Sequence, residues 1–150
     1  MSLIEVGSAV PDFDLVNQDG APVTRDRFSG NYVLLWWYPK ADTPGCTVEG
    51  KGFRDRIQDF TDNNTIVLGV SFDAPEDNRA FREKFDFPYD LLTDAEKSMS
   101  VAYGAAESDQ ARPSRASVLI GPDGRIAKAY GSVTPADHPD QVLADLASLG

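Results

Sequence analysis

Cys46 is the residue of this 150-residue chain whose surroundings most favour chemistry. It is the only cysteine, and it ends the sequence Thr43-Pro44-Gly45-Cys46, which follows an apolar run. A cysteine reacts as its thiolate, so groups that stabilise this anion make it reactive. Proline suits the first position of a helix and threonine suits the N-cap before it, so we expect a helix to begin here. Its free N–H groups and positive dipole end would stabilise a Cys46 thiolate.

The residues before Cys46 can serve chemistry or only local structure. Pro44 and Gly45 carry little side-chain bulk, so a small substrate could reach the sulfur and the backbone together. The hydroxyl of Thr43 can hydrogen-bond a thiolate or a bound oxygen. The same hydroxyl can cap the helix by accepting the N–H of Gly45 or Cys46. The sequence leaves both roles of Thr43 open.

Glu49 would work against a thiolate unless an arginine neutralised it. It follows Cys46 by three residues, which places both on one helical face. A carboxylate this close disfavours a second negative charge. Candidates for the neutralising arginine are Arg54, Arg112 and Arg115. Spacing alone does not choose among them.

A single cysteine can also have roles other than this chemistry. An arbitrary free cysteine is most often an inert, buried apolar residue. A dithiol reductase needs Cys-x-x-Cys, and here Thr43 occupies the first cysteine position. A cysteine hydrolase needs a histidine base. The only histidine, His138, has the neighbours of a surface or capping residue. One cysteine and one histidine also make a poor metal-ligand set. A redox sensor that oxidises at Cys46 with little turnover remains an alternative.

Composition indicates one globular domain spanning residues 1–150, with no cofactor. The net charge of −10 disfavours binding to nucleic acid and to anionic membranes. A lone cysteine cannot form an intramolecular disulfide. We see no signal peptide, and the longest apolar run, residues 32–38, is too short to span a membrane. We therefore expect a soluble protein of the reducing cytoplasm.

The pattern of apolar residues predicts the strands that must position Cys46. Residues 32–38 and 65–70 are continuous apolar runs, typical of strands buried on both faces. Alternation over residues 11–16, followed by a turn, predicts an N-terminal β-hairpin, and residues 117–120 and 125–130 predict a second hairpin. Trp36, Trp37 and Tyr38 either line the site or form core, and alternation predicts that only some of them face the site.

The predicted helices complete an α/β fold with a mixed central sheet. One amphipathic helix runs from Cys46 through Phe53, Ile57 and Phe60. Three more are expected over residues 75–86, 95–103 and 140–149. This order of elements gives a mixed sheet flanked by helices. Functional groups in such sheets gather beyond the carboxyl ends of strands, and Cys46 follows the first buried strand.

Residues 39–47 resemble the active-site segment of peroxiredoxins, whose pattern is Pro-x-x-x-Thr/Ser-x-x-Cys. The longer string over residues 38–55 is similar to the peroxiredoxin Q branch, also called bacterioferritin comigratory protein. Residues 7–13, 89–94 and 115–120 resemble further segments of that branch. The resemblance therefore covers nearly the whole chain.

The resemblance implies a thioredoxin-like fold and a thiol peroxidase that reduces hydrogen peroxide and organic hydroperoxides. Cys46 would attack the peroxide and become a sulfenic acid. Thr43 and Arg115 would hold the peroxide oxygens and stabilise the thiolate. Pro39 would shield the sulfenate, and Glu49 would orient the arginine. Without the resemblance, an arginine at the start of a strand would be taken for a solvated surface group.

One departure from the branch changes the expected reaction cycle. Many members carry a second, resolving cysteine five residues after the first, and that position is Lys51 here. The sulfenic acid must then be reduced by an external thiol, such as a thioredoxin, a glutaredoxin or a low-molecular-weight thiol. Direct contact with this reductant becomes part of the cycle. The sequence leaves open the preferred peroxide, the reductant, and whether the protein is a monomer or a homodimer.

Overall fold

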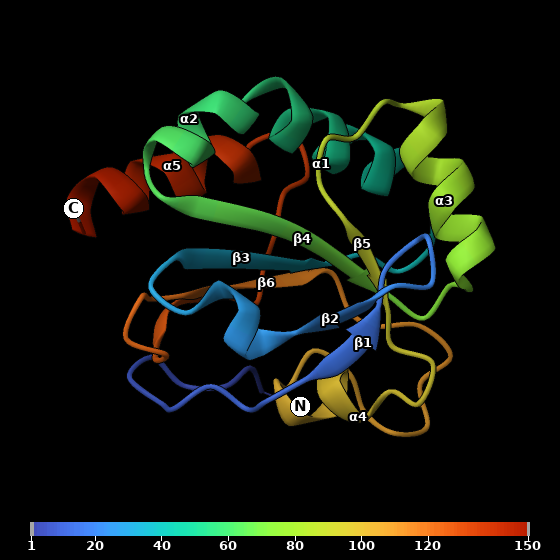
Figure 1. Ribbon diagram of the computed structural model, residues 1–150, viewed down its shortest axis with the longest axis horizontal. Coiled ribbons are helices and arrows are strands. Elements are labelled where there is room, and N and C mark those ends of the chain that lie inside the picture. Colours follow the sequence, from blue (N-terminus) through green and yellow to red (C-terminus); the bar gives the residue numbers. More distant parts are fainter. Residues whose placement is uncertain (1, 150) are drawn as a thin grey trace.

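The predicted mixed sheet is present, and its seven strands follow the order β2-β1-β5-β4-β3-β6-β7 (Figure 1). The computed structural model describes residues 2–149. The strands are β1 Asp14–Val16, β2 Pro22–Thr24, β3 Tyr32–Trp37, β4 Thr65–Ser71, β5 Leu91–Thr93, β6 Ala116–Ile120 and β7 Ile126–Tyr130. Both expected hairpins are confirmed, since β1 pairs with β2 and β6 pairs with β7, each antiparallel.

The centre of the sheet is formed by β3, which pairs parallel with β4 and antiparallel with β6. Its side chains alternate between two cores, as expected for a strand buried on both faces. Trp36 joins the core that contains Cys46, and Tyr38, just after the strand, joins the same core. Trp37 packs into the core on the opposite face. The prediction that only some of these three aromatic residues lie on the side of Cys46 is confirmed.

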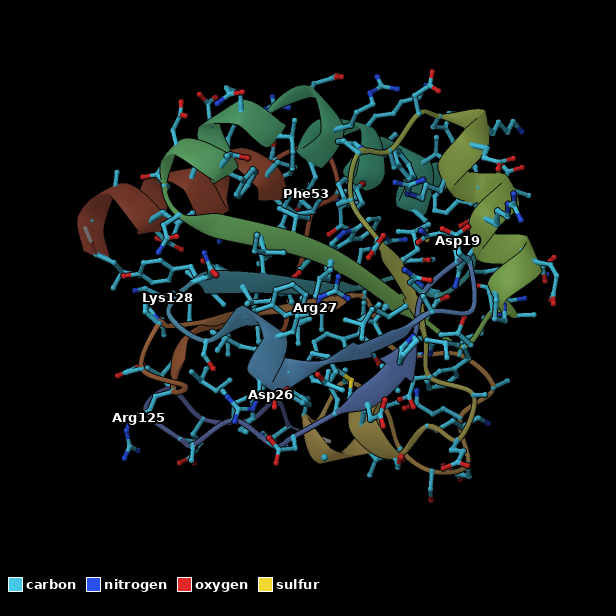
Figure 2. All side chains as sticks on the ribbon, in the orientation of Figure 1. Asp19, Asp26, Arg27, Phe53, Arg125 and Lys128 are labelled. Carbon is cyan, nitrogen blue, oxygen red and sulfur yellow. The ribbon has the colours of Figure 1, made fainter. Side chains whose placement is uncertain are left out.

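Helices cover both faces of the sheet unequally. They are α1 Pro44–Asp55, α2 Ile57–Asp62, α3 Pro75–Lys84, α4 Ser98–Ala102 and α5 His138–Leu149, with a short 3-10 helix, η1, at Arg25–Phe28. The core that contains Cys46 receives side chains from α1, α2, α3 and α5. These helices lie above the sheet in Figure 1, and α4 lies below it. Figure 2 shows Phe53 of α1 between this helical layer and the sheet.

One local prediction differs from the structure, and two short elements were not predicted. The expected single helix from Cys46 to Phe60 is interrupted at Arg56, whose φ of −112° and ψ of 13° are not helical. The side chain of Arg56 pairs with Asp140 of α5, at 2.6 Å. Strand β5 and the helix η1 were not predicted, because three or four residues are too few to show a periodicity.

Helix α1 holds three glycines that allow neighbours to pack closely. A Cβ atom on Gly45 would lie 2.8 Å from Arg115, and one on Gly50 would lie 2.5 Å from the ring of Phe87. A Cβ atom on Gly52 would lie 2.7 Å from Pro139, at the start of α5. These glycines let α1 pack closely against its neighbours, although glycine stabilises a helix less than alanine does.

Candidate active site

Cys46 is the third residue of α1 and lies beyond the carboxyl end of β3. Thr43 is the N-cap, with extended backbone, and its carbonyl accepts the first helical hydrogen bond, from the N–H of Thr47 at 2.9 Å. The N–H groups of Gly45 and Cys46 precede any intrahelical acceptor, so they point out of the helix end. This confirms the expected start of the helix. The Cys46 side chain is fully buried, with 0% exposure.

Arg115 joins Cys46 to Glu49. It immediately precedes β6, whose Ala116 pairs with Trp37 at the end of β3, so the pairing of these strands brings it to the start of α1. Its Nη2 lies 3.4 Å from the Sγ of Cys46, and its Nη1 donates to Oε1 of Glu49 at 2.9 Å.

Arg115 is thus the candidate arginine that contacts Glu49. Arg54 instead pairs with Asp55 at 2.9 Å and donates to the carbonyl of Phe85. Arg112 is exposed. The two nitrogens of one guanidinium therefore serve the sulfur and the carboxylate at the same time.

Burial is the largest single influence on the pKa values of Glu49 and Arg115. Glu49 is fully buried, and burial raises its pKa to about 7, although the hydrogen bond and charge of Arg115 oppose the rise. Its second oxygen, Oε2, has no hydrogen-bond partner within the described part of the chain. Burial acts against the charge of Arg115, but the negative charges of Cys46 and Glu49 outweigh it and raise the arginine's pKa. The site keeps a positive charge against the sulfur.

The side chain of Thr43 does not take the capping role that the sequence left open. Its hydroxyl makes no capping bond to the helix and instead donates to the carbonyl of Lys40, at 2.7 Å. With its hydrogen engaged, the Thr43 oxygen is left as an acceptor. Pro39, the last of the predicted site residues, is half-buried in the same loop between β3 and α1.

Three polar contacts that the sequence did not reveal hold this loop in place, one of them buried. The Tyr38 hydroxyl donates to Asn78 of α3, at 2.6 Å, and the N–H of Ala41 donates to Asp73, at 2.9 Å. Lys84, at the end of α3, binds Asp42 at 2.9 Å. The loop that carries Pro39 and Thr43 is therefore tied at three points to α3 and to the segment just before it. No local pattern could show these bonds, since their partners lie more than 30 residues apart in the sequence.

The expectation that His138 lies on the surface is wrong. Its side chain is fully buried, with one ring nitrogen 2.9 Å from the Ser117 hydroxyl and the other 3.0 Å from Gln141. Burial lowers its pKa, although Gln141 and Asp145 oppose this. Its ring also packs edge-on against Phe53. Both nitrogens are thus engaged away from Cys46, which leaves no histidine base for hydrolase chemistry.

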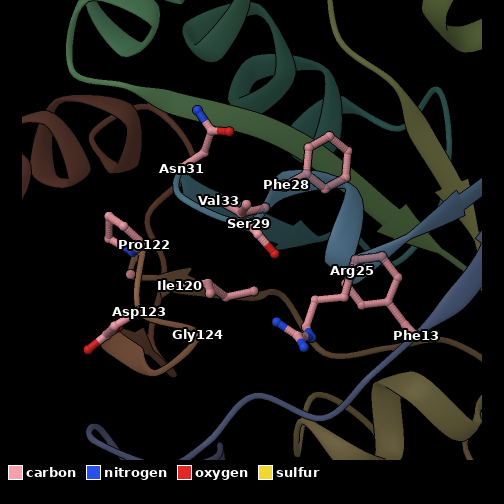
Figure 3. Close-up of a pocket in the computed structure, with 11 residues that line it drawn as sticks. Phe13, Arg25, Phe28, Ser29, Asn31, Val33, Ile120, Pro122, Asp123 and Gly124 are labelled. Atoms are coloured by element: carbon pink, nitrogen blue, oxygen red, sulfur yellow. The ribbon is translucent and has the colours of Figure 1, made fainter.

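A separate cavity of about 120 Å³ lies where η1 meets the turn between β6 and β7 (Figure 3). Arg25 and Phe28 line one side, and Ile120 and Pro122 line the other. Ile120 ends β6 and Arg115 precedes its start, so this cavity lies at the opposite end of the strand from Cys46. Within residues 2–149, no three side chains of the types that bind metals are close enough to hold an ion. No helix in the same range is long and apolar enough to cross a membrane.

Comparisons with known proteins agree with this geometry. The model of the AhpC/TSA family matches residues 6–129. Peroxiredoxin Bcp of Bacillus subtilis is 32% identical, with 97% of each chain covered. Peroxiredoxin Bcp of Escherichia coli is 35% identical, with 95% of this chain and 96% of that protein covered. A structure of the bacterioferritin comigratory protein of Xanthomonas campestris, described for its alkyl peroxide reduction activity, has a TM-score of 0.88 at 28% identity, with 99% of each chain covered.

Proposed function

Since this chain belongs to the AhpC/TSA family and is a thiol-dependent peroxidase related to the peroxiredoxins Bcp and Q, we propose that Cys46 is the residue that attacks the peroxide. The observation that carries this proposal is the position of Arg115, which contacts the sulfur of Cys46 and the carboxylate of Glu49 together. The family also confirms the expected thioredoxin-like fold, and it disfavours the alternative of a redox sensor with little turnover.

The chemical step follows from the nucleophilicity of the thiolate. The Cys46 sulfur attacks one oxygen of the hydroperoxide, the O–O bond breaks, and the other oxygen leaves as water or an alcohol after taking a proton. Cys46 is oxidised to a sulfenic acid while the peroxide is reduced. Arg115 stabilises the negative charge that moves from sulfur to the leaving oxygen.

The neighbouring residues orient the substrate. The Thr43 oxygen, whose own hydrogen is given to Lys40, accepts a hydrogen bond from the hydroperoxide O–H. Glu49 fixes the guanidinium of Arg115, so its remaining N–H groups can point at the peroxide. Pro39, from the loop beside the helix start, limits access of water and further peroxide to the sulfenic acid.

The second half of the cycle needs an external thiol. Cys46 is the only cysteine, so no internal disulfide can form. The substrates are hydrogen peroxide and organic hydroperoxides, the latter supported by the alkyl peroxide reduction described for the Xanthomonas campestris relative. The reductant is a thioredoxin, a glutaredoxin or a low-molecular-weight thiol. We place the protein in the cytoplasm, as a monomer or homodimer, because a free reactive thiol persists where thiols are kept reduced.

Steady-state peroxide consumption with dithiothreitol as the thiol donor tests this proposal. We expect saturable consumption of hydrogen peroxide and cumene hydroperoxide that disappears in Cys46→Ser. Mass spectrometry after one equivalent of peroxide should place a single added oxygen on Cys46. A rate no faster than that of free cysteine, or full activity of Cys46→Ser, would contradict it.

A further inference from the structure

His138 is a fully buried titratable side chain at the start of α5. This helix lies on the same side of the sheet as α1 (Figure 1). The backbone N–H of His138 donates to the carbonyl of Thr134, at 3.0 Å. The next residue, Pro139, packs on α1, where a Cβ atom on Gly52 would lie 2.7 Å from the proline ring. The start of α5 is therefore fixed against α1, and the imidazole is fixed with it.

The imidazole contacts the same two elements that Arg115 joins. On the strand side, its Nε2 lies 2.9 Å from the hydroxyl of Ser117, which belongs to β6. On the helix side, the ring packs edge-on against Phe53 of α1, with 5.9 Å between the ring centres. His138 thus forms a second connection between β6 and α1, beside the one that Arg115 makes through Glu49.

The two connections run side by side. Arg115 and Ser117 are two residues apart in an extended segment, which separates them by about 6 Å along the strand. Glu49 and Phe53 are four residues apart on one face of α1, which separates them by about 6 Å along the helix. A change at His138 that shifted β6 relative to α1 would therefore shift the guanidinium relative to the reactive sulfur.

The hydrogen bonds of the ring fix which nitrogen carries the hydrogen. Nδ1 of His138 lies 3.0 Å from Oε1 of Gln141, an oxygen that can only accept, so Nδ1 is the donor. Burial lowers the pKa of His138, so the ring is neutral near pH 7 and its Nε2 accepts from the hydroxyl of Ser117. Both side chains are fully buried, so neither can replace this bond with one to water. The bond therefore fixes α5 to β6.

We propose that His138 is a positioning residue for Arg115, because it sets the distance between β6 and α1 at which the guanidinium reaches the sulfur. This inference rests on the proposed peroxidase function, in which Arg115 stabilises the charge that moves to the leaving oxygen. Such a group must be held to within about 0.5 Å by packed neighbours and their hydrogen bonds. The ring nitrogens of His138 are taken by Ser117 and Gln141, so it acts through the position of Arg115.

A double-mutant cycle between His138→Leu and Arg115→Lys tests the proposal. Leucine is apolar and cannot bond Ser117. We expect the second-order rate constant for oxidation of Cys46 by hydrogen peroxide, measured by stopped flow, to fall about tenfold in His138→Leu, because misplaced catalytic groups react more slowly. In the Arg115→Lys protein, His138→Leu should change this constant by less than about twofold, since the guanidinium that His138 positions is gone. An equal fall in both proteins would overturn the proposal, because a general loosening of the core acts whether or not Arg115 is present.

Two further variants test the bond between His138 and Ser117. His138→Gln should react within about twofold of wild type, because the amide oxygen can accept from the Ser117 hydroxyl in place of Nε2. Ser117→Ala removes the same bond from the strand side with a smaller change of volume, and we expect it to slow the reaction about tenfold. It decides the question if His138→Leu does not fold. A wild-type rate constant in Ser117→Ala would overturn the proposal.

Ser100→Ala is the matched control for Ser117→Ala. It also removes a fully buried serine hydroxyl, which bonds Trp37 and Asp94 on the other face of the sheet. We expect Ser100→Ala to lose stability in thermal unfolding but to keep the wild-type rate constant. Equal slowing of the two serine variants would overturn the positioning role. If the wild type itself reacted with hydrogen peroxide no faster than free cysteine, the peroxidase function would be overturned instead.

Discussion

The guanidinium of Arg115 passes directly over Gly45, so closely that a Cβ atom at this position would lie 2.8 Å from its Nη2. The same nitrogen lies 3.4 Å from the Sγ of Cys46. Gly45 therefore keeps clear the space through which Arg115 reaches the sulfur. The glycine before the cysteine is a positioning residue for the arginine as well as a small residue beside the substrate.

Gly45→Ala should reduce peroxidase activity without unfolding the protein. The added methyl displaces the guanidinium, and misplaced catalytic groups cost roughly 10- to 100-fold in rate. Alanine stabilises a helix more than glycine does, so the free energy of unfolding should not fall through a loss of helix propensity. Stopped-flow measurement of Cys46 oxidation by peroxide, together with thermal unfolding, checks both parts. If Gly45→Ala kept wild-type kinetics, the position of Arg115 would not depend on the absence of a side chain at residue 45.

Arg115→Lys should slow the reaction with peroxide about 100-fold, the usual cost of losing one preorganised donor. A single ammonium cannot contact Cys46 and Glu49 in the way that the two nitrogens of a guanidinium do. Arg54→Lys is the control, because Arg54 lies on α1 with Cys46 but pairs with Asp55. The second-order rate constant for hydrogen peroxide is the measurement. Equal rate constants for the two variants would show that Arg115 takes no part in the reaction.

The stability of the protein should fall as pH rises from about 4.5 to about 7, through Glu49. Burial raises the pKa of this carboxyl to about 7 from its ordinary 4.5, so the folded protein holds a proton that the unfolded chain releases in this window. The contribution is complete below 4.5 and is lost by about pH 7. It amounts to about 3 kcal/mol, from about 1.4 kcal/mol per pH unit.

Urea unfolding of the wild type and Glu49→Gln at pH 5 and pH 8 measures this contribution. The neutral amide cannot titrate, so its loss of stability between these values should be smaller than that of wild type. Glu83→Gln, at an exposed position, serves as the control. Identical pH dependence in wild type and Glu49→Gln would mean that Glu49 stays charged throughout.

His138 should act in the opposite direction and over a more acidic range. Burial lowers its pKa below 6.5, so the unfolded chain takes up a proton that the folded protein does not. Its contribution to stability is full above pH 6.5 and decreases as the pH falls below that value. His138→Gln should therefore lose less stability than wild type between pH 7.5 and pH 5. A steeper loss in the variant would contradict the assignment of a neutral, buried imidazole.

Local patterns were sufficient to predict the framework of this fold. Apolar runs gave the central strands, turn residues gave both hairpins, and Thr43 with Pro44 marked the start of α1. Strand β5 and the helix η1 were missed because they are too short to show a periodicity and no turn motif marks them. The break at Arg56 was missed because Phe53, Ile57 and Phe60 keep helical spacing across it.

The residues of the candidate site also fall into those that a local segment predicts and those that depend on contacts distant in the sequence. Cys46 and Thr43 lie in one short segment, and its spacing alone drew attention to them, whereas the role of Pro39 came from the resemblance. Arg115 was chosen through resemblance, since only the pairing of β6 with β3 brings it near. The clearance at Gly45 depends on that long-range contact and could not be predicted. His138 was misplaced because its burial depends on how α5 packs against α1.

The glycines of α1 have a further consequence for how Cys46 meets a second protein. The sulfur has no exposed surface, so a partner thiol can reach it only when the first turn of the helix opens. Gly45 lies in this first turn and disfavours the helix by about 1 kcal/mol relative to alanine, which lowers the free energy needed for that opening. The residue that allows Arg115 to pack closely thus also sets how often the sulfur is presented, which amide hydrogen exchange along α1 would measure.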